Sequence, residues 1–324
     1  MMETDQLNEN DQLYLIEPSW NEKKNSFKKL ISNLVLYNRI NLIEYLINNF
    51  YTLNLSKFGF ERLEQYINYY TGLYGNRTLI DGKIAVNYDI IASGAAETAR
   101  YEILDLFKFS QSTVNYIATG AAKGGHLNIV IKALNLGASN INLVAYYAAK
   151  YGHVHILKYA LENGAIDIKE IAVGAAKGGY LNIVEELYRI KNFDLNSIVT
   201  AAVKKNKLNI LIWAVSMGVK INSKNLKAAV EYGYIDIFKY IVENSYSLDL
   251  MEAIEIAARY DELEMFKYII KHTDISIEEL KQIAKKYKSK KIVKYLNNYC
   301  SLLGKRKREC SEEFFIETKN PRFV

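Results

Sequence analysis

Cysteine and proline are nearly absent from this 324-residue chain. The two cysteines are Cys300 and Cys310, and the two prolines are Pro18 and Pro321. So few cysteines exclude a disulfide scaffold and indicate an intracellular, reducing compartment. Because both prolines lie near the chain ends, no proline interrupts helices in the long interior.

Long apolar runs are missing as well. Residues 1–26 are polar and lack the apolar run behind a basic start that marks a signal peptide. The longest apolar stretch in the interior, residues 208–219, has 12 residues and is too short to span a bilayer. We therefore expect no membrane partner.

Motifs for catalysis and cofactor binding are absent too. The sequence has no P-loop, no G-x-G-x-x-G that opens a helix and no G-x-S-x-G. The four histidines are His126, His153, His155 and His272. His153 and His155 have the spacing of a metal pair, but no third ligand recurs nearby. We expect no enzyme activity, no metal and no cofactor.

A period of 27 residues organises most of the chain. It is fixed by the last residue of an Ala-Ala-x-x-Gly element, which we call the register position. With small changes of spacing, the register positions are Ala99, Gly125, Gly152, Gly179, Asn206, Gly233, Asp261 and Lys288. An alanine precedes each by four residues: Ala95, Ala121, Ala148, Ala175, Ala202, Ala229, Ala257 and Ala284. Such self-similarity at a fixed period indicates a repeat architecture.

Each repeat predicts two helices. Before the register position, small residues recur at helical spacing, as in Val144, Ala145, Ala148 and Ala149. After it comes a bulkier stripe: Val154, Ile156, Leu157, Ala160 and Leu161. One helix pair cannot bury its apolar face alone, so the pairs must stack to form a continuous core.

The helix ends carry their own signals. A glycine at the register position can adopt the left-handed conformation that ends the first helix, and Gly137, Gly164 and Gly218 end the second. Asp167, Asp249 and Ser276 each precede a glutamate by three residues, which predicts capping boxes. We also expect His126 and His153 to form hydrogen bonds near a helix start.

The repeats resemble ankyrin repeats. Residues 124–138 (GGHLNIVIKALNLGA) and 152–165 (GHVHILKYALENGA) look like the second half of that motif. The usual ankyrin period is about 33 residues with a T-P-L-H element, which is missing here. This resemblance, with the shorter period, implies an all-α, ankyrin-like solenoid of stacked antiparallel helix pairs with reduced or absent β-hairpin fingers. Shortened repeats rich in Asn, Ile, Lys and Tyr are similar to those of ankyrin proteins from amoeba-infecting giant DNA viruses.

The period divides the chain into four segments. Residues 1–26 show no repeat, residues 27–91 form degenerate N-terminal repeats, residues 92–300 form the regular array, and residues 301–324 form a basic, disordered tail. In the degenerate part, residues 34–50 carry the second-helix pattern with Asn38 in the register. Gly72, Gly75 and Gly82 predict a longer loop around a helix at 60–70. The insertion at 51–90 is either a drifted repeat or a binding loop.

A row of cations precedes the register positions by two residues. We call it the lysine ladder; it reads Lys123, Lys150, Lys177, Lys204, Glu231, Arg259 and Lys286. The next position reads Gly124, Tyr151, Gly178, Lys205, Tyr232, Tyr260 and Tyr287. In the ankyrin family these positions are solvent-facing and line the concave face. The ladder is either a surface for an acidic partner or a solvated face that confers solubility.

The resemblance implies a monomeric protein–protein interaction scaffold without catalysis. Its concave face would bind a protein partner, a host protein if the viral resemblance holds. The alternative is nucleic-acid or polyanion binding through the lysine ladder and the KRKR cluster from Lys305 to Arg308. The formal net charge of +6 is below that of an obvious nucleic-acid binder. The same cluster allows a nuclear location in place of the cytoplasm.

Overall fold

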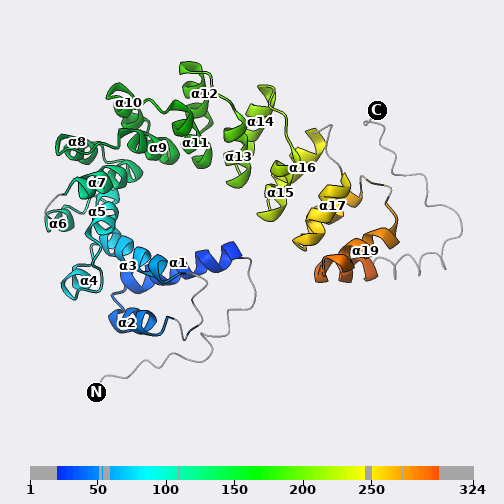
Figure 1. The fold of residues 1–324 in the computed structure, drawn as a ribbon, viewed down its shortest axis with the longest axis horizontal. Helices are drawn as coiled ribbons and strands as arrows, with labels where there is room; N and C mark the ends of the chain where they lie inside the picture. The colour runs from blue at the N-terminus through cyan, green and yellow to red at the C-terminus, as the bar shows by residue number, and fades with distance from the viewer. Residues whose placement is uncertain are drawn as a thin grey trace, which may run out of the picture. The chain divides into compact units, whose positions relative to one another are not determined.

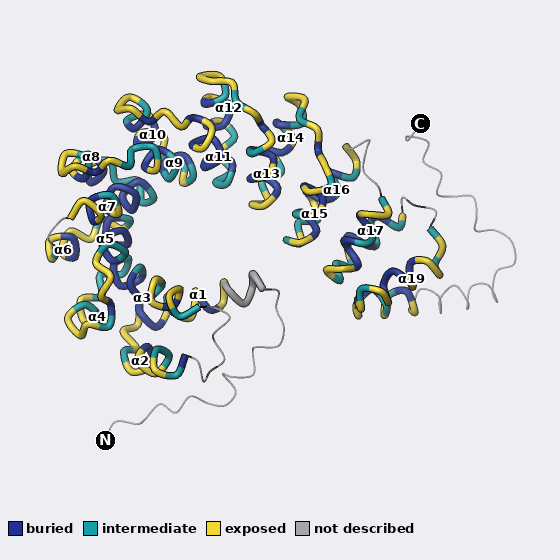
Figure 2. Tube along the Cα trace, in the orientation of Figure 1, coloured by how far each residue is buried: buried dark blue, intermediate teal, exposed yellow. Residues whose placement is uncertain are grey.

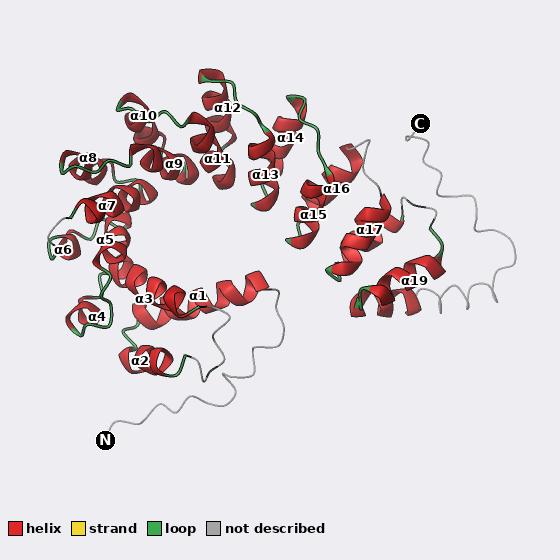
Figure 3. Ribbon diagram, in the orientation of Figure 1, coloured by secondary structure: helices red, strands yellow, loops and turns green. Residues whose placement is uncertain are grey.

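The computed structural model describes residues 20–50, 53, 59–107, 110–244, 250–271, 273 and 275–298, without the side chains of 20–24. The regular structure of these residues is entirely helical (Figure 3). The expected all-α fold is confirmed. No β-hairpin finger occurs at the described residues 137–144 or 164–171, as expected. The predictions for Asp249, His272, both cysteines and the tail from residue 301 lie outside the described residues.

The chain forms two compact units, Met1–Asn192 and Phe193–Val324. The helix pairs of the first unit are α1 (Trp20–Leu36) with α2 (Ile40–Asn48), α3 (Phe60–Tyr74) with α4 (Arg77–Asp81), α5 (Tyr88–Glu97) with α6 (Tyr101–Leu104), α7 (Gln111–Gly124) with α8 (Leu127–Asn135), α9 (Ile141–Tyr151) with α10 (Val154–Glu162), and α11 (Ile168–Gly178) with α12 (Leu181–Ile190). Those of the second unit are α13 (Asn196–Lys204) with α14 (Leu208–Ser216), α15 (Ser223–Glu231) with α16 (Ile235–Asn244), α17 (Leu250–Arg259) with α18 (Leu263–Ile270), and α19 (Ile277–Lys286) with residues 290–298.

The first helices of neighbouring pairs pack on one another and form a layer within each unit. In the first unit this layer runs from α1 through α3, α5, α7 and α9 to α11, on the inner side of the curve that the unit describes (Figure 1). The second helices lie on the outer side, and buried residues concentrate where the helices meet (Figure 2). In the second unit α13, α15, α17 and α19 form the corresponding layer.

The alanine of each repeat has two tasks. Its side chain is fully buried, with 0% exposure at all eight positions from Ala95 to Ala284. Its carbonyl accepts the backbone N–H of the residue that follows the register position, as from His153 to Ala148 at 2.8 Å and from Lys207 to Ala202 at 2.9 Å. This bond is typical of a Schellman turn, which ends a helix with one residue at positive φ.

The register position takes that positive φ whatever its residue type. Gly125, Gly152, Gly179 and Gly233 have φ between 72° and 96°. The non-glycine members, Asn38, Ala99, Asn206, Asp261 and Lys288, have φ between 52° and 57°. Left-handed backbone is costly for residues with a Cβ, so stacking of the helix pairs holds the turn there. The proposed register is confirmed, including at its non-glycine positions.

The insertion between the first two predicted register positions is another helix pair. α3 ends at Gly75, whose φ of 68° makes it a register position, and α4 follows directly. The prediction of a loop at Gly72 is wrong, because Gly72 is buried within α3. A Cβ there would lie 1.9 Å from the Ile91 carbonyl oxygen, so glycine lets α3 and α5 approach closely.

Two local predictions also need correction. Val154 is 47% exposed, although the second-helix stripe that includes it was expected to be buried. It occupies the first position of α10, before the buried Ile156 and Leu157. Asp167 makes no side-chain cap, whereas Ser276 forms the predicted capping box with Glu279.

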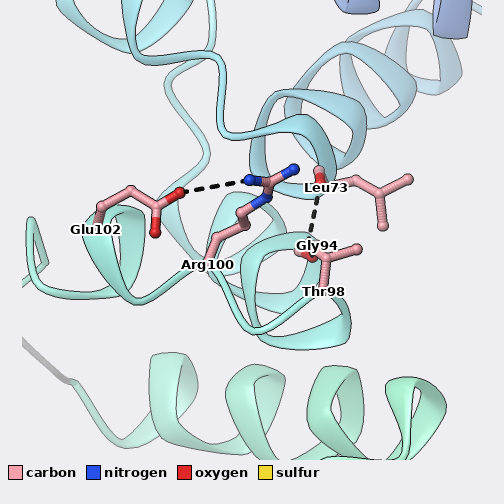
Figure 4. Close-up of polar contacts among 5 residues, drawn as sticks. All are labelled: Leu73, Gly94, Thr98, Arg100 and Glu102. Atoms are coloured by element: carbon pink, nitrogen blue, oxygen red, sulfur yellow. Dashed lines mark hydrogen bonds and ion pairs between the residues drawn. The ribbon is translucent and has the colours of Figure 1, made fainter.

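Hydrogen bonds between side chains and the preceding repeat join successive first helices. The Nε2 atoms of His126 and His153 lie 3.1 Å and 2.9 Å from the carbonyl oxygens of Glu97 and Lys123. Thr98 donates to the Leu73 carbonyl at 2.9 Å (Figure 4). These carbonyls belong to the last turn of a helix, where the chain supplies no helical partner. The expected histidine bonds are thus present, and they link repeats.

Candidate functional site

The lysine ladder behaves differently in the two units. Lys123, Lys150 and Lys177 of the first unit are half-buried, whereas Lys204, Glu231, Arg259 and Lys286 of the second are exposed. The expectation of a uniformly solvent-facing row is therefore wrong for the first unit. There the last turns of α7, α9 and α11 place the lysines beside tyrosine rings, which cover much of each side chain.

Lys123 lies between two aromatic rings from different helices. Its Nζ is 4.9 Å from the centroid of Tyr147 on α9 and 5.7 Å from that of Tyr69 on α3. Burial lowers the pKa of Lys123, although the Glu97 carboxylate opposes this shift. Attraction between an ammonium group and a ring face offsets part of the cost of removing the cation from water.

The next two lysines repeat the arrangement. Lys150 Nζ is 5.7 Å from the Tyr147 ring and 5.2 Å from the Tyr151 ring. Lys177 Nζ donates to the Tyr146 hydroxyl at 2.9 Å and lies 5.2 Å from the centroid of that ring. The rings of Tyr146 and Tyr147 meet edge to face, with centroids 5.2 Å apart. Lysines from three consecutive repeats thus share one cluster of tyrosines, centred on α9.

Glu97 adds a carboxylate to this cluster. It accepts a hydrogen bond from the Tyr69 hydroxyl at 2.7 Å, and burial followed by this carboxylate raises the pKa of Tyr69. The same two causes raise the pKa of Tyr151. Glu97 was missed in the sequence, although it precedes Ala99 by two residues and so belongs to the ladder. Extending the ladder upstream by one repeat would have found it.

We call these residues the inner cluster: Tyr69, Glu97, Lys123, Tyr146, Tyr147, Lys150, Tyr151 and Lys177. Glycines make room for it. A Cβ at Gly174 of α11 would lie 2.9 Å from the Tyr146 ring, and Gly120 and Gly94 occupy the corresponding place in α7 and α5. The inner cluster therefore extends over a layer of small residues and presents cations and phenol groups from four helices.

The second unit holds a smaller group of the same kind. Lys286 Nζ pairs with Glu255 at 3.0 Å and lies 4.9 Å from the Tyr287 ring centroid. The Arg259 guanidinium lies 5.2 Å from the same ring. Lys205 and Tyr260 are exposed, and Tyr232 stacks on Tyr234 with centroids 5.8 Å apart. An exposed ion pair such as Lys286–Glu255 is screened by solvent and contributes little to stability, so this group is held less firmly.

Metal ligation finds no support in the described part of the chain. None of its histidines and acidic residues form a group of three that could hold a metal ion. His153 and His155 each lie within hydrogen-bond distance of a backbone carbonyl oxygen, at 2.9 Å and 3.2 Å. Within the same residues, no helix combines the length and apolarity needed to cross a membrane.

Comparison with known proteins assigns the chain to no family. No model of a known protein family matches the chain, and no curated protein sequence matches it.

Proposed function

We propose that this chain is a binding protein built from ankyrin-like repeats, which captures an acidic segment of a protein partner on the inner cluster. In this proposal it has no catalytic activity, and the partner is a host protein if the resemblance to giant-virus ankyrin proteins reflects its origin. The observation that carries the proposal is the half-burial of Lys123, Lys150 and Lys177 against tyrosine rings.

Solubility alone does not favour this placement. A lysine that serves solubility extends its ammonium group into water, whereas burial lowers the pKa of Lys123. The inner cluster contains three lysines and one carboxylate, that of Glu97, so its formal net charge is positive. Rings that restrict the lysine side chains also reduce the entropy lost on binding. Carboxylates of a partner would complement both the ammonium groups and the phenol donors.

The proposal predicts that charge reversal at the cluster abolishes partner capture. Lys150→Glu with Lys177→Glu inverts two of the three cations and should remove the partners that the tagged wild-type chain retains from cell lysate. The matched control is Lys158→Glu with Lys169→Glu, which changes the net charge equally at exposed residues of α10 and α11. Circular dichroism checks the fold of each variant. Identical partner sets for the cluster variant and the wild type would contradict the proposal.

Polyanion binding is the second candidate, favoured by the same three lysines and by the KRKR cluster, which lies outside the described residues. Binding of a labelled single-stranded DNA, measured against salt, separates the two. Contacts to phosphates give a log–log slope of about −0.7 per neutralised phosphate. A steep slope with tight binding at 0.15 M salt would favour the polyanion, and negligible DNA binding favours the protein partner.

A further inference from the structure

A groove of the first unit shares no lining residue with the inner cluster. It has a volume of about 1430 Å³ and is lined by residues of α2, the first half of α3, residues 80–84 and 86–87, the start of α5, and Leu106, Phe107, Ser110 and Thr113. The second helices beside it are short: α4 has 5 residues and α6 has 4, against 9 in α8 and α10. Because these helices cover less of the repeats, a groove remains open along this face.

Most of the charged residues that line this groove are carboxylates. Its acidic lining residues are Glu44, Glu61, Glu64, Asp81 and Asp89, and Lys83 is the one cation among the described residues that line it. We call it the acidic groove. Asp89 accepts hydrogen bonds from the hydroxyls of Ser112 and Thr113, and Asp81 pairs with Arg77 at 3.4 Å. Glu44, Glu61 and Glu64 are exposed, so their charges face solvent in the groove.

Apolar surface accompanies these charges. Val86 is 58% exposed, Tyr88 is 53% exposed and Leu106 is 39% exposed, and all three line the groove. The Tyr88 ring packs against Phe107 with centroids 5.2 Å apart, which fixes its position. A ligand in the groove would therefore meet both negative charge and apolar contacts.

The spacing of the carboxylates argues against a single metal ion as the ligand of the groove and favours a chain of cations. Among the described residues, no three acidic or other ligating side chains come close enough to hold one metal ion. The volume also exceeds the range of roughly 300–1000 Å³ that is typical of small-molecule pockets. Charges distributed along an open groove complement a chain of cations better than a single ion.

We propose that the acidic groove binds an extended, lysine- or arginine-rich segment of a partner protein that carries apolar residues between its cations. Lysine and arginine side chains would approach Glu44, Glu61 and Glu64, and apolar residues would contact Val86 and Tyr88. The negative charge of the acidic groove is opposite in sign to the charge of the inner cluster. The inference therefore stands whether or not the inner cluster binds a partner. Charge complementarity of this kind selects partners and accelerates association.

The test uses the full chain and a fluorescein-labelled peptide of four Arg-Leu repeats, with a Glu-Leu peptide as the negative probe. Fluorescence anisotropy should show binding of the Arg-Leu peptide that weakens with salt, because exposed charges are screened. Glu61→Gln with Glu64→Gln should weaken it about tenfold. Glu162→Gln with Glu186→Gln, at exposed residues of α10 and α12, should leave the affinity within about twofold of the wild type.

Three outcomes would overturn the proposal. In the first, the Arg-Leu peptide binds both double variants equally, and in the second it does not bind the wild type at 0.1 M salt. In the third, sedimentation velocity would show that the wild type self-associates and that Glu61→Gln with Glu64→Gln abolishes the association. That result would assign the groove to a second copy of this chain.

Discussion

Valine in place of Gly120 is expected to destabilise the first unit by about 3 kcal/mol or more. A Cβ at this position would lie 2.1 Å from the Ser93 carbonyl oxygen and 2.9 Å from the Ser93 Cα, both backbone atoms of the preceding first helix. Overpacking of a core commonly costs about 1–3 kcal/mol. Backbone cannot move aside as a side chain does, so α5 and α7 must separate and lose further contacts.

Urea unfolding followed by circular dichroism measures this effect. Asn128→Val is the matched control, because residue 128 is exposed on α8 and the substitution introduces the same β-branched side chain into a helix. An unfolding midpoint for Gly120→Val equal to that of the control would show that the first helices do not pack as closely as described.

Alkaline pH should destabilise the first unit through Tyr70. Burial, followed by the neighbouring Tyr74 and Tyr66 hydroxyls, raises the pKa of Tyr70 to about 12 from an ordinary value of 10.0. Between these two values the unfolded chain releases the proton and the folded chain retains it. The contribution of protonated Tyr70 to the free energy of unfolding is therefore fully present below pH 10 and is lost as the pH rises towards 12. At pH 11 the loss is about 1.4 kcal/mol.

Tyr70→Phe isolates this contribution, since phenylalanine keeps the ring and has no proton to release. The fall in unfolding free energy from pH 8 to pH 11 should be smaller in Tyr70→Phe than in the wild type by about 1.4 kcal/mol. Tyr45→Phe, at an exposed residue of α2, controls for the loss of a hydroxyl as such. Equal pH dependence in wild type and Tyr70→Phe would mean that Tyr70 does not titrate as described.

The repeat architecture could be predicted because its signals are local. The alanine and the register residue are four positions apart and belong to one turn, so their spacing survives even where Asn206, Asp261 or Lys288 replaces glycine. The pair α3/α4 was harder to place, because Gly75 follows Asn38 by 37 residues and precedes Ala99 by 24. A fixed period cannot detect a repeat whose loops differ so much in length.

The candidate site was only partly predictable. The sequence located Lys123, Lys150, Lys177 and Tyr151, since they share a register. It did not indicate that the Tyr146 ring would lie against Gly174 of α11 or that the Tyr147 ring would lie beside Lys123 of α7, because both depend on side-chain direction across repeats. The acidic groove has no sequence signature either. Its carboxylates come from α2, α3, α4 and α5, and packing of these helices brings them to one face.

Crosslinking from the inner cluster tests the central claim most directly. A photoreactive benzoyl-phenylalanine at Tyr151, which is 40% exposed at the end of α9, should form covalent adducts with the protein that the wild-type chain captures. Benzoyl-phenylalanine in place of the exposed Lys158 of α10, in the outer layer, should form no adducts with this protein. Adducts from position 158 with none from position 151 would contradict recognition by the inner cluster.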